Sequence, residues 1–179
     1  MKNVLMTTAP KITHAFAILA PVPEEHLLSG LESIQVQEAK GIEEPIVAFG
    51  STAFNIFRKA DELRGGHGGS LVEVFLYASH AEEQPLTPKA TWHAIYVKHI
   101  EARNGRYPKE RSYERPETAL NGDKPVWAIF WQVQSLKKLN VPIPIKQFHG
   151  LDKRSPYQAR FIPEGPLLVQ YPQLPGSVS

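Results

Sequence analysis

The chain contains no cysteine, which excludes disulfide bonds, thiolate metal sites and cysteine nucleophiles. It also lacks any apolar run near the roughly 20 residues that a membrane-spanning helix needs. Its first residues, Met1 to Val4, do not show the basic and apolar regions of a secretory signal. These absences predict a protein of the cytoplasm that does not contact membranes, and no sequence feature implies a cofactor.

A strong excess of charge of either sign is also missing, because 20 Lys and Arg are balanced by 18 Asp and Glu. The distribution of these charges is uneven. Residues 1–48 contain three Lys and six Glu, a net charge of −3, whereas residues 49–179 contain 17 basic and 12 acidic residues, a net charge of +5. A basic region is expected of a protein that binds a polyanion, so nucleic acid is the first partner to consider.

The apolar residues follow patterns that predict the elements of one domain spanning residues 1–179. A helix introduced by Gly50, with Ser51 or Thr52 as its N-cap, is expected to end at the glycine-rich residues 65–69, which suit a turn better than a phosphate-binding loop. Strands are predicted at residues 12–20, 46–49, 71–79, 91–100 and 126–134, and a second helix is predicted at residues 24–37.

Three segments lack such patterns. Residues 101–125 are charged and nearly free of aliphatic side chains, which predicts a long inserted basic loop. Residues 141–146 contain two prolines and are predicted to form an extended, edge-type segment. A Pro-rich tail from about residue 163 is expected to wrap the surface. Because strands and helices do not alternate regularly, the predicted fold is α+β, a small, mostly antiparallel β-barrel with short helices at its ends.

The segment from Lys98 to Arg115 holds the most suggestive polar residues. Its cations include Arg106, Arg111 and Arg115, and tyrosines are interleaved among them. Guanidinium groups bind phosphate and aromatic rings stack on unpaired bases, so this mixture suits nucleic acid. The alternative is a solvated loop with internal ion pairs.

The three tryptophans have different expected roles. Trp127 and Trp131 lie on the apolar face of their predicted strand, which favours core packing. Trp92 follows a loop at the start of a strand, where a side chain that stacks on a ligand at a pocket rim would lie, although simple packing is the alternative.

Metal-dependent and nucleophilic catalysis find little support in the sequence. The seven histidines show no His-x-x-x-His spacing, so no metal site is predicted. No Gly-x-Ser-x-Gly element is present either. A protein that binds without catalysing a reaction is therefore favoured.

Two segments resemble the core of the EVE domain, a family of the PUA-like superfamily. They are the helix Ala53-Phe54-Asn55-Ile56-Phe57-Arg58 and the strand Val74-Phe75-Leu76-Tyr77-Ala78-Ser79-His80. Downstream, Pro125-Val126-Trp127 through Pro142-Ile143 is similar to the closing segment of that family. The resemblance implies a small β-barrel whose pocket binds nucleic acid, often at a flipped or modified base.

The same resemblance implies four binding residues. Asn55 and Arg58 match the helix element, while Tyr77 and Ser79 match the end of the strand. Tyr77 and Ser79 also share the face of their strand opposite the predicted core, which suits stacking on a base and recognition of its edge. Local capping by Asn55 and an ion pair of Arg58 with an acid on its own helix are the structural alternatives.

The leading hypothesis is a reader of nucleic acid that admits one base into its pocket while residues 98–115 hold phosphates. One alternative is a hydrolase of RNA or modified nucleosides on the same fold, related to ASCH domains. Its candidate residues are Lys59, Ser79, His80 and His93. A second alternative is an accessory protein that binds a partner through the Pro-rich tail and the acidic first helix.

Overall fold

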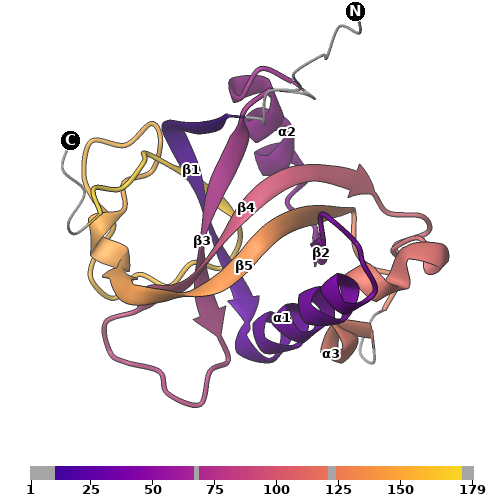
Figure 1. The fold of residues 1–179 in the computed structure, drawn as a ribbon. Coiled ribbons are helices and arrows are strands. Elements are labelled where there is room, and N and C mark those ends of the chain that lie inside the picture. The colour runs from indigo at the N-terminus through magenta and orange to yellow at the C-terminus, as the bar shows by residue number, and fades with distance from the viewer. Residues whose placement is uncertain (1–10, 67–68, 121–123, 175–179) are drawn as a thin grey trace, which may run out of the picture.

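The backbone forms one six-stranded mixed sheet flanked by helices (Figure 1). A computed structural model describes residues 11–66, 69–120 and 124–174. In chain order, the elements are β1 (Ile12–Pro23), α1 (Glu24–Ala39), β2 (Val47–Ser51), α2 (Phe54–Leu63), β3 (Leu71–Ser79), β4 (Lys89–Glu101), η1 (Lys109–Glu114), α3 (Glu117–Leu120), β5 (Ile129–Pro144), η2 (Ile145–Gln147) and β6 (Leu167–Val169).

The strands of this sheet follow the order β2-β5-β4-β3-β1-β6. All neighbouring pairs are antiparallel except β1 and β3, which are parallel. Between the described edge strands β2 and β6 no ladder forms, so a closed barrel is not observed. The predicted α+β class and the mostly antiparallel pairing are confirmed.

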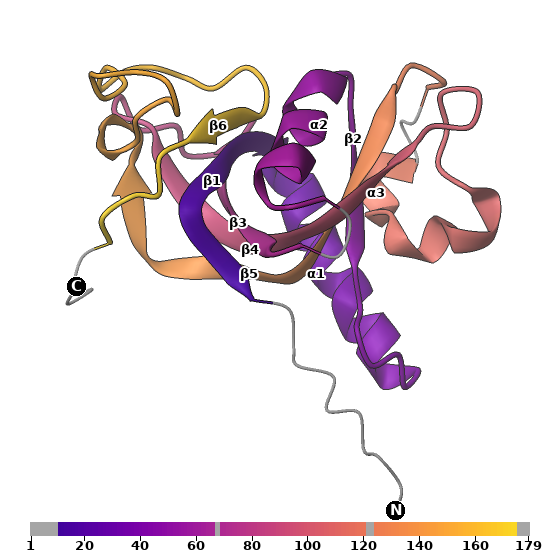
Figure 2. The same ribbon diagram turned by 90° about the horizontal axis from the view of Figure 1, so that it is seen from above.

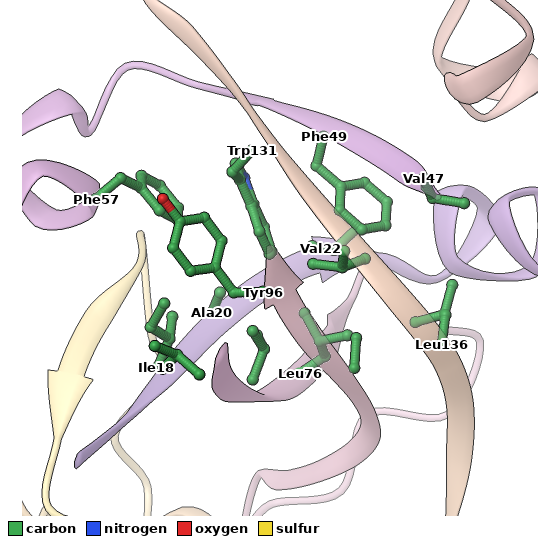
Figure 3. Close-up of a cluster of buried hydrophobic side chains, with 14 of the residues drawn as sticks. Ile18, Ala20, Val22, Val47, Phe49, Phe57, Leu76, Tyr96, Trp131 and Leu136 are labelled. Atoms are coloured by element: carbon green, nitrogen blue, oxygen red, sulfur yellow. The ribbon is translucent and has the colours of Figure 1, made fainter. Parts of the chain in front are cut away.

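The main core lies between the sheet and the two longer helices. On β3 the alternate residues Val72, Val74 and Leu76 are fully buried, as their spacing predicts. Leu27 and Ile34 of α1 point into the same core. Figure 3 shows this cluster, in which aromatic side chains of α2, β2, β4 and β5 gather beside the aliphatic residues of β1 and β3.

The start of α2 differs from its prediction. Its N-cap is Ala53, which has no side chain able to cap. The hydroxyl of Ser51 instead accepts a hydrogen bond from the Ala53 amide at 2.9 Å, one residue before the helix. The helix ends at Leu63, and Gly65 and Gly66 adopt positive φ as expected of a glycine stop. His67 and Gly68 of the predicted turn lie outside the described residues.

Strand β5 joins two segments that the sequence separates. It runs without a break from Ile129 to Pro144, so residues 141–144 continue the strand that begins before them, while Ile145 and Lys146 belong to η2. Ile143 and Pro144 pair with β4, and β2 reaches only Ile129 to Val133, so the predicted extended, edge-type character is confirmed for residues 141–144. Midway, Ser135 has a φ of 56°, and the pairing with β4 shifts there. An extra residue of this kind is a β-bulge, which bends a strand and strengthens its twist.

The remaining two segments are more ordered than predicted. Residues 101–125 are not a loop without structure, because they contain η1 and α3, and α3 contacts α1. The Pro-rich tail from residue 163 contains β6, whose central Leu168 pairs with Ile18 of β1. Asn121 to Asp123 and residues 175–179 lie outside the described residues, as do residues 1–10, where the signal prediction falls.

No helix within the described residues combines the length and the apolar character that crossing a membrane requires.

Candidate functional site

A cavity of about 430 Å³ lies where the end of β1, the first turn of α1 and the connection from β2 to α2 meet. The segment that carries α3 and residues 164–166 complete its walls. Ligand cavities in proteins span roughly 300–1,000 Å³, so this volume suits a small molecule or a single base. Its aromatic and polar lining consists of Glu25, His26, Phe49, Ser51, Thr52, Arg115, Thr118, Trp127, Trp131 and Glu164.

Trp127 forms one aromatic wall, and its position depends on a glycine. Its indole lies directly against the backbone of Gly50 at the end of β2. A Cβ atom on Gly50 would lie 2.6 Å from the ring, closer than a carbon atom can approach. Trp127 is half-buried and packs against a small core of Ala48, Tyr107 and Phe130, so its predicted packing role is confirmed outside the main core.

Trp131 forms a second aromatic wall, and two phenylalanine rings pack against its indole. Its ring centroid lies 5.1 Å from that of Phe49 and 5.3 Å from that of Phe57, with the Phe57 ring nearly parallel. Phe57 in turn contacts the ring of Tyr96 at 5.5 Å. Figure 3 shows Trp131 between Phe57 and Phe49. This row of rings makes the wall rigid, because each ring is held by its neighbours.

Another wall of the cavity comes from residues 115–119, which lie in the segment 101–125 that was predicted to be a loop. The Oγ of Thr118 lies 2.7 Å from Nδ1 of His26, and its backbone amide donates to the hydroxyl of Ser29 at 3.3 Å. Both contacts join α3 to α1. The first turn of α1 and α3 therefore form one rigid side of the cavity.

Arg115 is the residue of the predicted site that lines this cavity, but it is only 3% exposed. Its guanidinium donates to the carbonyl of Ala48 at 2.9 Å and lies 4.9 Å from the ring centroid of Phe130. These contacts attach η1 and α3 to strand β2. Arg115 is therefore a structural side chain, and the expectation that it grips a phosphate in solvent is wrong.

Arg111 is also held by contacts inside its own segment. Its guanidinium contacts both carboxylate oxygens of Glu114, at 2.8 and 3.1 Å. The buried Glu114 also accepts a hydrogen bond from Tyr107 at 2.7 Å. Burial, followed by the contact with Glu114, raises the pKa of the Tyr107 hydroxyl, which keeps it protonated as a donor. The alternative of internal ion pairs thus describes this side chain.

Arg106 is the exception among the predicted cations of this segment. It is exposed at the end of a tight turn through Asn104 and Gly105, where its backbone pairs with that of Arg103. Arg103 itself pairs with Glu110 at 3.1 Å. Among the residues described, Arg106 makes no ion pair, so a phosphate contact of its side chain stays a prediction.

The residues expected from the family resemblance do not line the cavity. Asn55 and Arg58 are exposed on α2, and the Arg58 guanidinium lies 5.2 Å from the ring centroid of Phe54. Tyr77 lines a different, more open hollow of about 800 Å³ beside the connection from β3 to β4, and Ser79 is half-buried on the same strand end.

Trp92 also borders this second hollow, yet its side chain belongs to the core. It is 2% exposed, and Nζ of Lys138 lies 5.5 Å from the centroid of its ring. The interpretation of Trp92 as an open stacking ring at a rim is therefore corrected to core packing, as its alternative proposed. A role for Tyr77 and Ser79 in binding stays a prediction.

The four candidates for catalysis are not joined by hydrogen bonds in the described structure. His93 is paired with Glu73 through Nε2 at 2.8 Å, and Lys59 lies 3.5 Å from a carboxylate oxygen of Asp152. Ser79 and His80 make no side-chain hydrogen bond within the described residues, and His80 is exposed with a φ of 54°. The geometry thus offers no nucleophile joined to a base.

Two buried polar clusters brace the elements around these hollows. In the first, the carboxylate of Asp61 on α2 contacts Arg64, Tyr96 and His99 at 2.8 to 3.1 Å. Burial by itself raises the pKa of Asp61, but the hydrogen bond from His99 and the charge of Arg64 outweigh it, so the pKa lies below its ordinary value. This cluster ties α2 to β4.

The second cluster lies on the other side of the sheet. Glu73 on β3 contacts His93 at 2.8 Å and His14 at 3.5 Å. Burial raises its pKa, but hydrogen bonds from His93 and Tyr171 outweigh that effect and hold the pKa below its usual range. Within the described residues, no group of three His, Asp or Glu is arranged to hold a metal ion.

Comparison of the chain with family models, curated proteins and solved structures finds no match. The similarity to EVE domains therefore rests on the short motifs alone and stays a prediction.

Most lining residues of the 430 Å³ cavity escaped sequence analysis. Phe49 ends a predicted strand, Ser51 and Thr52 were considered only as N-caps of the next helix, and His26 lies in a helix turn 92 residues before its partner Thr118. Two residues of the site stood out in the sequence. Gly50 lies just before the predicted helix, and Trp127 follows Pro125 at the start of the predicted strand 126–134.

Proposed function

We propose that this protein binds nucleic acid and that the 430 Å³ cavity receives a single unpaired or flipped base. The observation that carries the proposal is Trp127, a half-buried indole that lines the cavity, supported from the core side by the buried Trp131. Proteins that recognise extruded bases stack them on aromatic rings and read their edges with hydrogen bonds. Both kinds of group are present.

Polar groups for recognising the edge of a base lie around these rings. Ser51 and Thr52 supply hydroxyls that donate or accept, and Glu25 and Glu164 supply carboxylates that accept. Acceptors of this kind suit the amino groups of adenine or cytosine, since carboxylates bind exocyclic amines. The lining therefore favours a base over a phosphate, because acidic side chains would repel an anion at this position.

The closest alternatives receive less support from the described geometry. A hydrolase needs a nucleophile held by a base, and Ser79, His80 and His93 are not connected in this way. A PUA-like barrel with bound nucleic acid remains consistent with the proposal, although the proposal does not depend on barrel closure. It depends on the cavity.

Binding is tested with short oligonucleotides, single- and double-stranded, with and without modified bases, at two salt concentrations. We expect Trp127→Ala to weaken binding about 5- to 150-fold, the range that loss of one base–aromatic stack produces. Gly50→Ala should weaken it as well, because a new Cβ displaces Trp127 while the indole itself is retained.

The matched control is Tyr113→Ala, which removes an aromatic ring of η1 that is exposed and does not line the cavity. It should bind as the wild type does. If no oligonucleotide binds the wild-type protein at low salt, the proposed function is wrong. If binding occurs but is equal in Trp127→Ala and Tyr113→Ala, the cavity is not where the base lies.

A further inference from the structure

A second basic region lies in residues 152–161, and its cations make no ion pair with any residue that the structure describes. Lys153, Arg154 and Arg160 are exposed, and none of them contacts a carboxylate in the described parts of the chain. The one acid of the segment, Asp152, lies 3.5 Å from Nζ of Lys59 on α2. The positive charge of this segment is therefore not compensated from within.

The backbone of residues 152–161, called the cationic loop below, is anchored although its side chains are exposed. The amide of Tyr157 donates to the carbonyl of Phe148 at 2.9 Å, and the side-chain amide of Gln170 donates to the carbonyl of Lys153 at 3.1 Å. The rings of Tyr157 and Phe161 stack at 4.6 Å with only 8° between their planes. The loop thus presents its cations from a fixed frame.

The surface of the cationic loop is also hollowed. A depression of about 540 Å³ is lined by its residues, and no acidic side chain is among them. The stacked rings of Tyr157 and Phe161 form part of its floor, beside Lys153, Arg154 and Arg160. Both rings are half-buried, so the exposed groups of this depression are chiefly its cations, which bind the phosphates of an unpaired strand.

This loop is connected to the cavity on two sides. Along the chain, only Ile162 and Pro163 separate Phe161 from Glu164, which lines the cavity. Across the surface, Lys59 reaches Asp152 from α2, and α2 begins two residues after Thr52 at the cavity wall. Figure 2 shows α2 beside β6, and these two elements are in contact.

We propose that the cationic loop, together with Arg58 and Lys59 of α2, binds the sugar-phosphate backbone of a strand whose base enters the cavity. The proposal rests on the proposed function for the cavity. These side chains are exposed, and among the described residues only Lys59 has an acidic partner, Asp152, in an exposed pair that a phosphate can replace. Phosphates supply the missing negative charge, and each neutralised phosphate releases a counterion.

This proposal places the phosphate contacts in a different segment from the one that the sequence predicts. Sequence analysis predicts them in residues 98–115, where the structure shows Arg103, Arg111 and Arg115 already engaged. Lys98, Arg106 and Lys109 are also exposed, but among the described residues the cationic loop is the segment whose Lys and Arg are all free of ion pairs and line one depression without acids. Two variants with three alanines each, one in each segment, separate these possibilities.

The first variant combines Lys153→Ala, Arg154→Ala and Arg160→Ala. The control variant combines Lys98→Ala, Arg106→Ala and Lys109→Ala, three exposed cations of the other segment. Fluorescence polarisation measures the affinity of each protein for a labelled single-stranded 12-mer between 50 and 300 mM salt. Calorimetry measures the affinity for an unlabelled mononucleotide, which is too short to reach the loop.

We expect the loop variant to bind the 12-mer about 10- to 100-fold more weakly at 0.1 M salt. The slope of log affinity against log salt should fall by about 2, since each phosphate contact on a single strand contributes roughly 0.7. Binding of the mononucleotide should not change, and the control variant should bind the 12-mer like the wild type. Circular dichroism confirms that each variant is folded.

Equal affinity and equal salt slope of the loop variant and the wild type would overturn the inference. So would a larger loss in the control variant than in the loop variant. These outcomes are distinct from failure of the proposed function. If the loop variant loses affinity while Trp127→Ala does not, the cationic loop binds the strand and the cavity does not receive its base.

Discussion

Residues 98–115 and the cationic loop 152–161 are both rich in Lys and Arg, but their cations face different surroundings. In the first segment Arg103 and Arg111 pair with acids of the same segment, and Arg115 is buried against Phe130. Only Lys98, Arg106 and Lys109 of that segment are exposed without an ion pair to a described residue. In the second segment, Lys153, Arg154 and Arg160 are all exposed and pair with no described acid. A count of basic residues therefore does not predict a binding surface, because it ignores the partners that the fold supplies.

The difference also explains what each segment contributes to the cavity. Residues 98–115 use Arg103, Arg111 and Arg115 in internal contacts, and Arg115 holds the segment to β2. Thr118 of the adjoining α3 holds it to α1. The cationic loop leaves its charges at the surface on the opposite side of the cavity. One segment thus builds the site and the other is available for a ligand.

The largest expected difference between the segments is in stability, at Arg115. We expect Arg115→Ala to lower the free energy of unfolding by about 2–4 kcal/mol, because it removes a buried side chain together with its hydrogen bond to Ala48. Arg154→Ala in the cationic loop should change it by less than about 0.5 kcal/mol, as exposed substitutions usually do. Urea denaturation measures both. Similar losses of unfolding free energy in Arg115→Ala and Arg154→Ala would contradict the expected difference between the two segments.

A smaller difference is expected between two acids of the first segment. Glu114→Ala leaves the buried Tyr107 hydroxyl without its acceptor and should lower the free energy of unfolding by about 1–2 kcal/mol. Glu110→Ala breaks only the exposed pair with Arg103 and should have no measurable effect. Thermal unfolding of the two variants at one pH provides the comparison. A greater loss in Glu110→Ala would mean that the exposed pair, not the buried network, holds the segment.

The smallest expected effect concerns pH and the anchoring of α2, the helix that adjoins the cationic loop. The pKa of Asp61 is lowered in the folded state, so its contribution is complete above the ordinary value near 3.9 and is lost as the pH falls through the lowered pKa. We expect the free energy of unfolding to decrease below about pH 4.

The variant Asp61→Asn should show a shallower decrease on acidification than the wild type, because residue 61 no longer binds a proton. Asp152→Asn serves as its control, since that carboxylate is exposed and paired only with Lys59. Its acid profile should match that of the wild type. An unchanged profile for Asp61→Asn would show that the Asp61 cluster does not govern the acid response.

Local patterns were sufficient to predict most of the individual elements. The alternation Val72, Val74, Leu76 identifies the core face of β3, and the helix from Glu24 begins where two acids favour its dipole. Such features depend on neighbours two to four residues away. The predicted strands and helices are therefore found close to their expected positions.

Contacts between distant parts of the chain were not predictable in the same way. The three residues of β6 are too few to give a pattern, and they form a strand only because β1 lies beside them. Similarly, Arg115 appears exposed in a charged segment until β2 brings Ala48 next to it. The cavity combines residues from five separate segments, so its lining follows from the tertiary fold alone.

The bulge at Ser135 has a consequence for the two ends of β5. Before it, the odd-numbered Trp131 and Val133 face the main core; after it, the even-numbered Leu136 does, while Ile143 belongs to a separate core near the cationic loop. Without Ser135, Leu136 would follow Val133 by two positions, so it would keep the core face and its register with β4. The extra residue therefore sets the local bend and twist of β5 and does not decide which side chains are buried.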